Sequence, residues 1–137
     1  MKLDSSAFVA DRELIEALEK RATRIVCEDD RVLFAQGESP AGLYILKAGG
    51  ARLAMASPTG DMIMSIPVVP GSLLGLPALI GNQPYSLTAK ALKGAELHFV
   101  SHASFSRLML DEPRLSLSIL RVLAAEVRTA RYAISEF

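Results

Sequence analysis

The chain has 137 residues, of which 50% are hydrophobic and 22% charged, so it is long and apolar enough to fold as one domain around one core. Fifteen lysines and arginines balance fifteen aspartates and glutamates, which excludes the strong basic field of a protein that binds nucleic acid unaided. The single cysteine, Cys27, excludes an internal disulfide and a four-cysteine metal site. The N-terminus lacks the apolar run of a signal peptide. These features predict one cytoplasmic domain, residues 1–137.

The first predicted element is a short amphipathic helix within residues 1–22. Leu14, Leu18 and Ala22 recur at helical spacing. Asp11 precedes them, and an aspartate at this place can accept a hydrogen bond from a free backbone N–H of the first turn. The pattern therefore predicts a lead-in helix with one apolar face.

Residues 23–100 are predicted to form a β-barrel. Turn signals rich in glycine and proline recur about every ten to thirteen residues. Between them lie short runs suited to strands, at residues 31–35, 42–47, 51–56, 62–68, 87–91 and 95–100. There is room for about eight strands, which indicates an antiparallel jelly roll, the double-stranded β-helix. The uncharged segment 62–89 belongs to this barrel and is no membrane span, because four prolines interrupt it. The fold class is thus mainly β with flanking helices.

Residues 101–137 are predicted to be helical and to end in the longest helix of the chain. Pro113 can occupy its first turn, and residues 115–133 contain neither glycine nor proline.

This long helix carries two apolar stripes. Leu115, Ile119 and Val122 are expected to lie on the barrel. The second stripe has the alternating spacing of a coiled-coil seam and consists of Leu120, Leu123, Val127, Ala130 and Ile134. We expect it to join two copies of the chain. The alternative is a single helix that buries both stripes against its own barrel.

Four segments also match a family in order and spacing. They are LFAQGE at 33–38, LYILKAG at 43–49, GSLLGLPAL at 71–79 and YSLTAKA at 85–91. Together they resemble the cyclic nucleotide-binding domain of the catabolite activator and other Crp/Fnr regulators. The resemblance implies a jelly roll, a phosphate-binding cassette at residues 71–86 and a dimer formed through the last helix.

The cassette of that family binds the nucleotide through a glutamate on the ribose and an arginine on the cyclic phosphate. Here Leu76 stands at the glutamate's position and Tyr85 at the arginine's. Residues 62–89 contain no cation, and an unpaired buried anion costs several kcal/mol. The candidate ligand-binding residues are Gly75, Leu76, Pro77, Ala78, Tyr85, Ser86 and Leu87. A cyclic nucleotide is disfavoured by Leu76 and Tyr85, and no cofactor is predicted.

The function predicted from these features is effector sensing without catalysis. A homodimeric regulatory domain with a degenerate nucleotide site would respond to an apolar or weakly polar effector. Two alternatives are a genuine cyclic AMP or cyclic GMP domain that uses backbone contacts, and a ligand-free dimerisation module. No arrangement of catalytic groups or metal ligands converges on the uncharged loop, and Cys27, His98 and His102 are interpreted as structural.

The partners predicted are a second copy of the chain and a small effector, with neither a membrane nor direct contact to nucleic acid. Transcription factors of the family carry a winged helix after the dimer helix, whereas this sequence ends at Phe137. The chain is then either a stand-alone sensor domain or part of a longer regulator.

Overall fold

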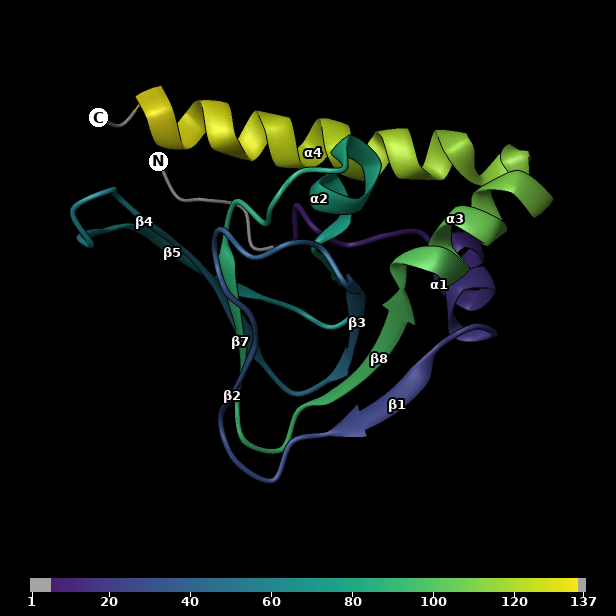
Figure 1. Ribbon diagram of the computed structural model, residues 1–137, viewed down its shortest axis with the longest axis horizontal. Coiled ribbons are helices and arrows are strands. Elements are labelled where there is room, and N and C mark those ends of the chain that lie inside the picture. The colour runs from purple at the N-terminus through teal and green to yellow at the C-terminus, as the bar shows by residue number, and fades with distance from the viewer. Residues whose placement is uncertain (1–5, 136–137) are drawn as a thin grey trace.

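The computed structural model describes residues 6–135, with side chains described from Ser6 to Arg128. In this described range eight strands and four helices follow one another, with a 3₁₀ turn before the last helix (Figure 1). The strands are β1 (Thr23–Val26), β2 (Arg31–Phe34), β3 (Gly42–Ala48), β4 (Ala51–Ala56), β5 (Met62–Val68), β6 (Leu73–Leu74), β7 (Thr88–Ala91) and β8 (Glu96–Ser101). The helices are α1 (Arg12–Glu19), α2 (Leu76–Gly81), α3 (His102–Asp111) and α4 (Ser116–Ser135), and the turn is η1 (Pro113–Leu115).

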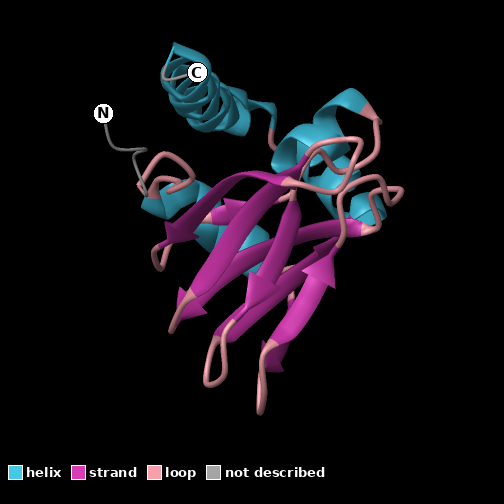
Figure 2. Cartoon of the chain, turned by 90° about the vertical axis from the view of Figure 1, so that its left-hand side faces the viewer, coloured by secondary structure: helices cyan, strands magenta, loops and turns pink. Residues whose placement is uncertain are grey.

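The strands form two antiparallel sheets of four strands each (Figure 2). One sheet has the order β1-β8-β3-β6 and the other β2-β7-β4-β5. Each sheet therefore pairs a strand from the beginning of the barrel sequence with one from its end, namely β1 with β8 and β2 with β7. Such long-range antiparallel pairing is the jelly roll that the sequence predicted.

Two strands were not among the predicted runs. β1 is an edge strand in which only Ile25 is partly buried, so it lacks the apolar alternation of a half-buried strand. β6 contains only Leu73 and Leu74, which pair with β3. A two-residue strand is too short for any period to be visible in the sequence.

Strand β3 is apolar on both faces, and the reason is its position between two cores. Leu46 and Tyr44 pack into the cluster between the sheets. Leu43 and Ile45 point the other way, into a cluster with residues of α1, α3 and α4. Helices thus cover the outer face of this sheet, which explains a nearly continuous apolar strand.

Helix α1 begins where the sequence predicted. The Asp11 carboxylate accepts a hydrogen bond of 2.9 Å from the N–H of Leu14. A hydrogen bond from Ser118, followed by the one from Leu14, holds the pKa of Asp11 below its ordinary value. Because Ser118 lies on α4, the carboxylate also links the two helices. The helix ends at Glu19, earlier than the predicted residue 22.

The predicted barrel-facing stripe, which begins in η1 and continues on α4, is buried as expected. Leu115, Ile119 and Val122 have exposures of 1%, 4% and 3%. On the opposite side Leu120 and Val127 are 59% and 52% exposed, and Leu123 is half-buried. Figure 1 shows α4 running along the end of the barrel. Ala130 and Ile134, the rest of the predicted seam, lie outside the residues whose side chains are described.

No helix in the described range 6–135 combines the length and the apolar character that a membrane span needs.

Candidate functional site

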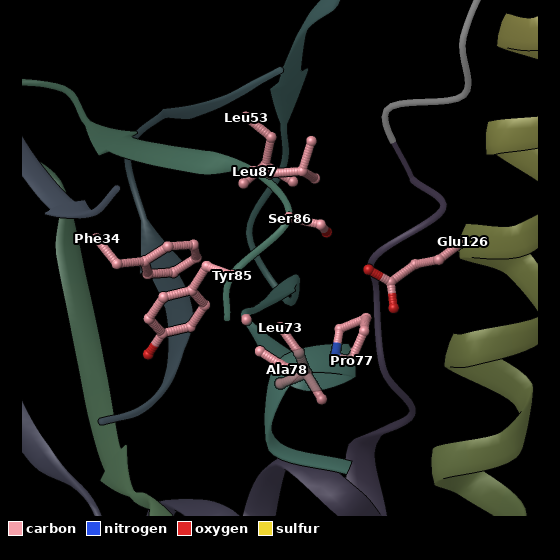
Figure 3. Close-up of a pocket in the computed structure, with 10 residues that line it drawn as sticks. Phe34, Leu53, Leu73, Pro77, Ala78, Tyr85, Ser86, Leu87 and Glu126 are labelled. Atoms are coloured by element: carbon pink, nitrogen blue, oxygen red, sulfur yellow. The ribbon is translucent and has the colours of Figure 1, made fainter. Parts of the chain in front are cut away.

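A cavity lies between the barrel, α2 and α4 (Figure 3). Its walls come from β2, β4, β6, α2, the loop after α2, and α4. The lining residues are Phe34, Leu53, Leu73, Gly75, Pro77, Ala78, Tyr85, Ser86, Leu87 and Glu126. The cavity volume is about 40 Å³, which is room for a few water molecules. Most of the wall is apolar.

The loop that carries α2 is shaped by backbone conformations that its residues allow. Gly75 has a φ of +97°, and a Cβ there would lie 2.9 Å from the Tyr85 ring. Only glycine fits this position without strain. Pro77 lies in the first turn of α2, and Asn82, with a φ of +51°, ends the helix. The result is one short helix above the cavity.

Tyr85 is anchored inside the barrel and forms one wall of the cavity. Its ring stacks on Phe34, with the ring centroids 3.8 Å apart and an interplanar angle of 16°. Its hydroxyl donates a hydrogen bond of 2.6 Å to the carbonyl of Gly42 and accepts one of 3.2 Å from the N–H of Gly42. The side chain is 4% exposed. The hydroxyl therefore acts as both a hydrogen-bond donor and an acceptor within the protein.

Glu126 is the one acidic residue among the described residues of the cavity wall. Figure 3 shows its side chain reaching from α4 toward Pro77 and Ser86. Its Oε2 atom is buried and has no hydrogen-bond partner among the described residues. Burial raises the pKa of this carboxyl from 4.5 to about 8. At neutral pH the group is therefore mostly protonated.

Sequence reasoning missed Glu126, although a signal was present. The residue follows Val122 by four positions and so continues the apolar stripe that faces the barrel. A charged residue on an apolar stripe is an anomaly that the helical spacing alone reveals.

The structure brings together six of the predicted ligand-binding residues, namely Gly75, Pro77, Ala78, Tyr85, Ser86 and Leu87. Leu76 is not among the lining residues. It is fully buried and packs with residues of α1 and α3. A leucine at the start of α2 points into the helix-covered core, away from the cavity.

Cys27 and His98, which the sequence analysis interpreted as structural, lie outside the cavity wall. Cys27 is buried and unbridged, and the Nε2 atom of His98 lies 3.1 Å from Oε2 of Glu96. Within the described part of the chain, no three His, Cys, Asp or Glu residues gather as metal ligands would.

Comparison with known proteins decides the family. The profile of the cyclic nucleotide-binding domain matches residues 24–112, which include the barrel, α2 and α3. The chain belongs to the cyclic nucleotide-binding domain family. A search of curated proteins found no significant match.

Solved structures share the cyclic nucleotide-binding fold. The catabolite activator protein of Thermus thermophilus matches with a TM-score of 0.77 and 21% identity, over 91% of this chain and 59% of its own. The sensor domain of the transcriptional regulator DNR from Pseudomonas aeruginosa matches with a TM-score of 0.66 and 19% identity, over 93% and 83%. A cyclic nucleotide-binding-like protein from Brucella abortus matches with a TM-score of 0.55 and 32% identity, over 71% and 83%. This chain spans about three-fifths of the length of the Thermus protein.

Proposed function

We propose that this chain is a cytoplasmic, non-enzymatic, homodimeric effector-sensing domain of the Crp/Fnr type whose cyclic nucleotide site is degenerate. The observation that carries the proposal is the state of Tyr85, which stands where the family has its phosphate-binding arginine. Its ring is stacked on Phe34 and its hydroxyl is bonded to Gly42. A neutral, fully bonded side chain offers nothing to a phosphate.

The charge of the cavity supports the same conclusion. Apart from Glu126, the described residues that line the cavity are neutral, so none of them offers a cation to a cyclic phosphate. Losing an arginine contact to the phosphate and a carboxylate contact to the ribose costs about 2 to 3 kcal/mol each. Together these losses weaken binding by roughly three to four decades.

The proposed assembly is a pair of α4 helices. A groove of about 460 Å³ runs along the exposed side of α4 and is lined by Leu120, Leu123, Ala124, Val127 and Arg128. Exposed apolar residues at coiled-coil spacing fit a second copy of the same helix. The occupant that we propose for this groove is therefore α4 of a second chain.

The proposed mechanism is a shift between two arrangements of that dimer. The cavity touches α4 through Glu126 and α2 through Pro77 and Ala78. An effector that fills it would change how α4 sits on the barrel. Because α4 also carries the proposed seam, such a change would alter the relation between the two subunits.

Calorimetric titration with cyclic AMP and cyclic GMP tests the degenerate site. We expect no saturable heat at tens of micromolar of either nucleotide. A saturable signal at low micromolar concentration would overturn the proposal and favour a genuine nucleotide domain that binds through backbone contacts.

A further inference from the structure

The Glu126 carboxyl has a polar atom that the described part of the fold does not satisfy. Its Oε2 atom is buried without a hydrogen-bond partner among the described residues. Buried polar atoms are nearly always bonded, so an unpaired one calls for an explanation. The carboxyl also borders the cavity and reaches toward it from α4. A molecule in the cavity could supply the missing partner.

The surroundings restrict the chemistry of that molecule. Phe34, Leu53, Leu73 and Leu87 offer only apolar contacts, and the Tyr85 hydroxyl is occupied by Gly42. Ser86 is the remaining polar side chain of the wall. Once ionised, the Glu126 carboxylate would repel an anionic ligand, whereas it would attract a cation and accept hydrogen bonds from it.

We propose that the cavity binds a small organic cation, with a protonated nitrogen on Glu126 and an aliphatic body against the apolar wall. This inference rests on the proposed effector-sensing function and names the chemical class of the effector. Since the cavity measures about 40 Å³, the body has to be short, and binding has to widen the space between α4 and α2.

The pH dependence of binding follows from the groups around Glu126. On the barrel side Tyr85 is the only other titratable lining residue. The N-terminal residues Ala7 and Phe8 are neutral. They are buried in the hydrophobic cluster against which Ala125, the neighbour of Glu126 on α4, packs. Next along α4, Arg128 is exposed. Glu126 must ionise to pair with an ammonium group, and burial sets its pKa at about 8. Affinity should therefore rise about tenfold from pH 7 to pH 9.

Butylammonium is a suitable probe, because its nitrogen stays protonated over this range as that of lysine does. Butanol and butyrate are the matched neutral and anionic probes. We would titrate each into the full chain, follow backbone amides by NMR, and follow the Glu126 side-chain carboxyl carbon as a function of pH. We expect saturable shifts at Gly75, Ser86 and Leu87 with butylammonium, together with a lowered Glu126 pKa.

Two variants locate the effect. Glu126→Gln keeps the shape of the side chain and should weaken butylammonium binding at least tenfold at pH 9. Glu16→Gln removes an exposed glutamate that pairs with Arg12 on α1, and it should bind as the unmodified chain does. Thermal melting of both variants checks that they fold.

The outcomes separate the inference from the proposed function. Equal binding of butanol and butylammonium, or no shift of the cavity amides with butylammonium, would overturn the cation assignment and leave the degenerate nucleotide site standing. Preference for butyrate would also overturn the assignment. An unchanged Glu126 pKa at saturating butylammonium would do so even if a variant failed to fold. Low-micromolar binding of cyclic nucleotide would instead overturn the proposed function.

Discussion

The hydroxyl of Tyr85 satisfies both backbone polar groups of one buried residue, Gly42. Phenylalanine at position 85 would keep the ring stack on Phe34 but leave the N–H and carbonyl of Gly42 without these partners. Each unsatisfied buried group costs about 1 to 3 kcal/mol. We therefore expect Tyr85→Phe to lower the free energy of unfolding by about 2 kcal/mol, measured by urea denaturation.

Tyr44→Phe is the matched control. The Tyr44 hydroxyl makes a single long hydrogen bond of 3.4 Å to the carbonyl of Leu33, and the residue is only half-buried. Its loss should cost well under 1 kcal/mol. Equal losses in the two variants would mean that the Gly42 contacts contribute nothing particular.

Glu126 should make the stability of the fold depend on pH. Its pKa is about 8 in the folded protein against an ordinary value of 4.5. Between these values the folded protein holds a proton that the unfolded chain has lost, so stability falls as pH rises through this window. The loss from pH 5 to pH 8 is on the order of 3 kcal/mol.

The comparison with Glu126→Gln isolates this carboxyl from every other titrating group. We expect the difference in unfolding free energy between the variant and the unmodified chain to grow in the variant's favour from pH 5 to pH 8. The carboxyls of Asp11 and Glu96 do not interfere, since hydrogen bonds lower the pKa of both. A difference independent of pH would show that the Glu126 carboxyl titrates normally.

Helix α4 offers a test of the proposed seam that leaves the barrel core untouched. Leu120 and Val127 are exposed in the single chain, so aspartate at both positions should not unfold it. In a pair of helices the same aspartates would become buried unpaired charges, which cost several kcal/mol. We expect the double variant to sediment as a monomer where the unmodified chain sediments as a dimer.

Leu110→Asp provides the control for surface charge. Leu110 lies on α3 and is 80% exposed, outside the predicted seam. This variant should keep the dimer. If the Leu120 and Val127 double variant still sediments as a dimer, the copies meet through another surface.

At this scale the sequence predicted most regular elements and six of the residues that line the cavity, but neither the direction of Leu76 nor the contribution of α4. α1 and six of the strands follow from periodicity and turn residues, which act over a few neighbouring positions. β1 is specified by its pairing with β8 rather than by its own pattern. The direction of Leu76 and the approach of Glu126 to α2 depend on how distant helices pack, which local patterns do not encode.

The whole chain is electrically balanced, and this bears on nucleic acid. With fifteen basic and fifteen acidic residues, it lacks the field that gathers phosphates. Several cations are already paired, among them Arg21 with Asp111 and Arg24 with Glu96. We expect these 137 residues not to retard a DNA duplex in a gel at physiological salt. Sequence-selective retardation that weakens with salt would contradict this expectation.

The pairing of β1 with β8 also sets the order in which the protein can fold during synthesis. The side chains of Arg24 on β1 and Glu96 on β8 are hydrogen-bonded although 72 positions separate them in the sequence. At about 5 to 20 residues per second, the ribosome needs roughly 4 to 14 s to travel from one to the other. From its own synthesis until β8 follows, the inner strand β3 lacks this neighbour and exposes apolar side chains on both faces. Nascent chains shorter than about 100 residues should therefore be substrates for chaperones, and the barrel should close only after its last strand has emerged.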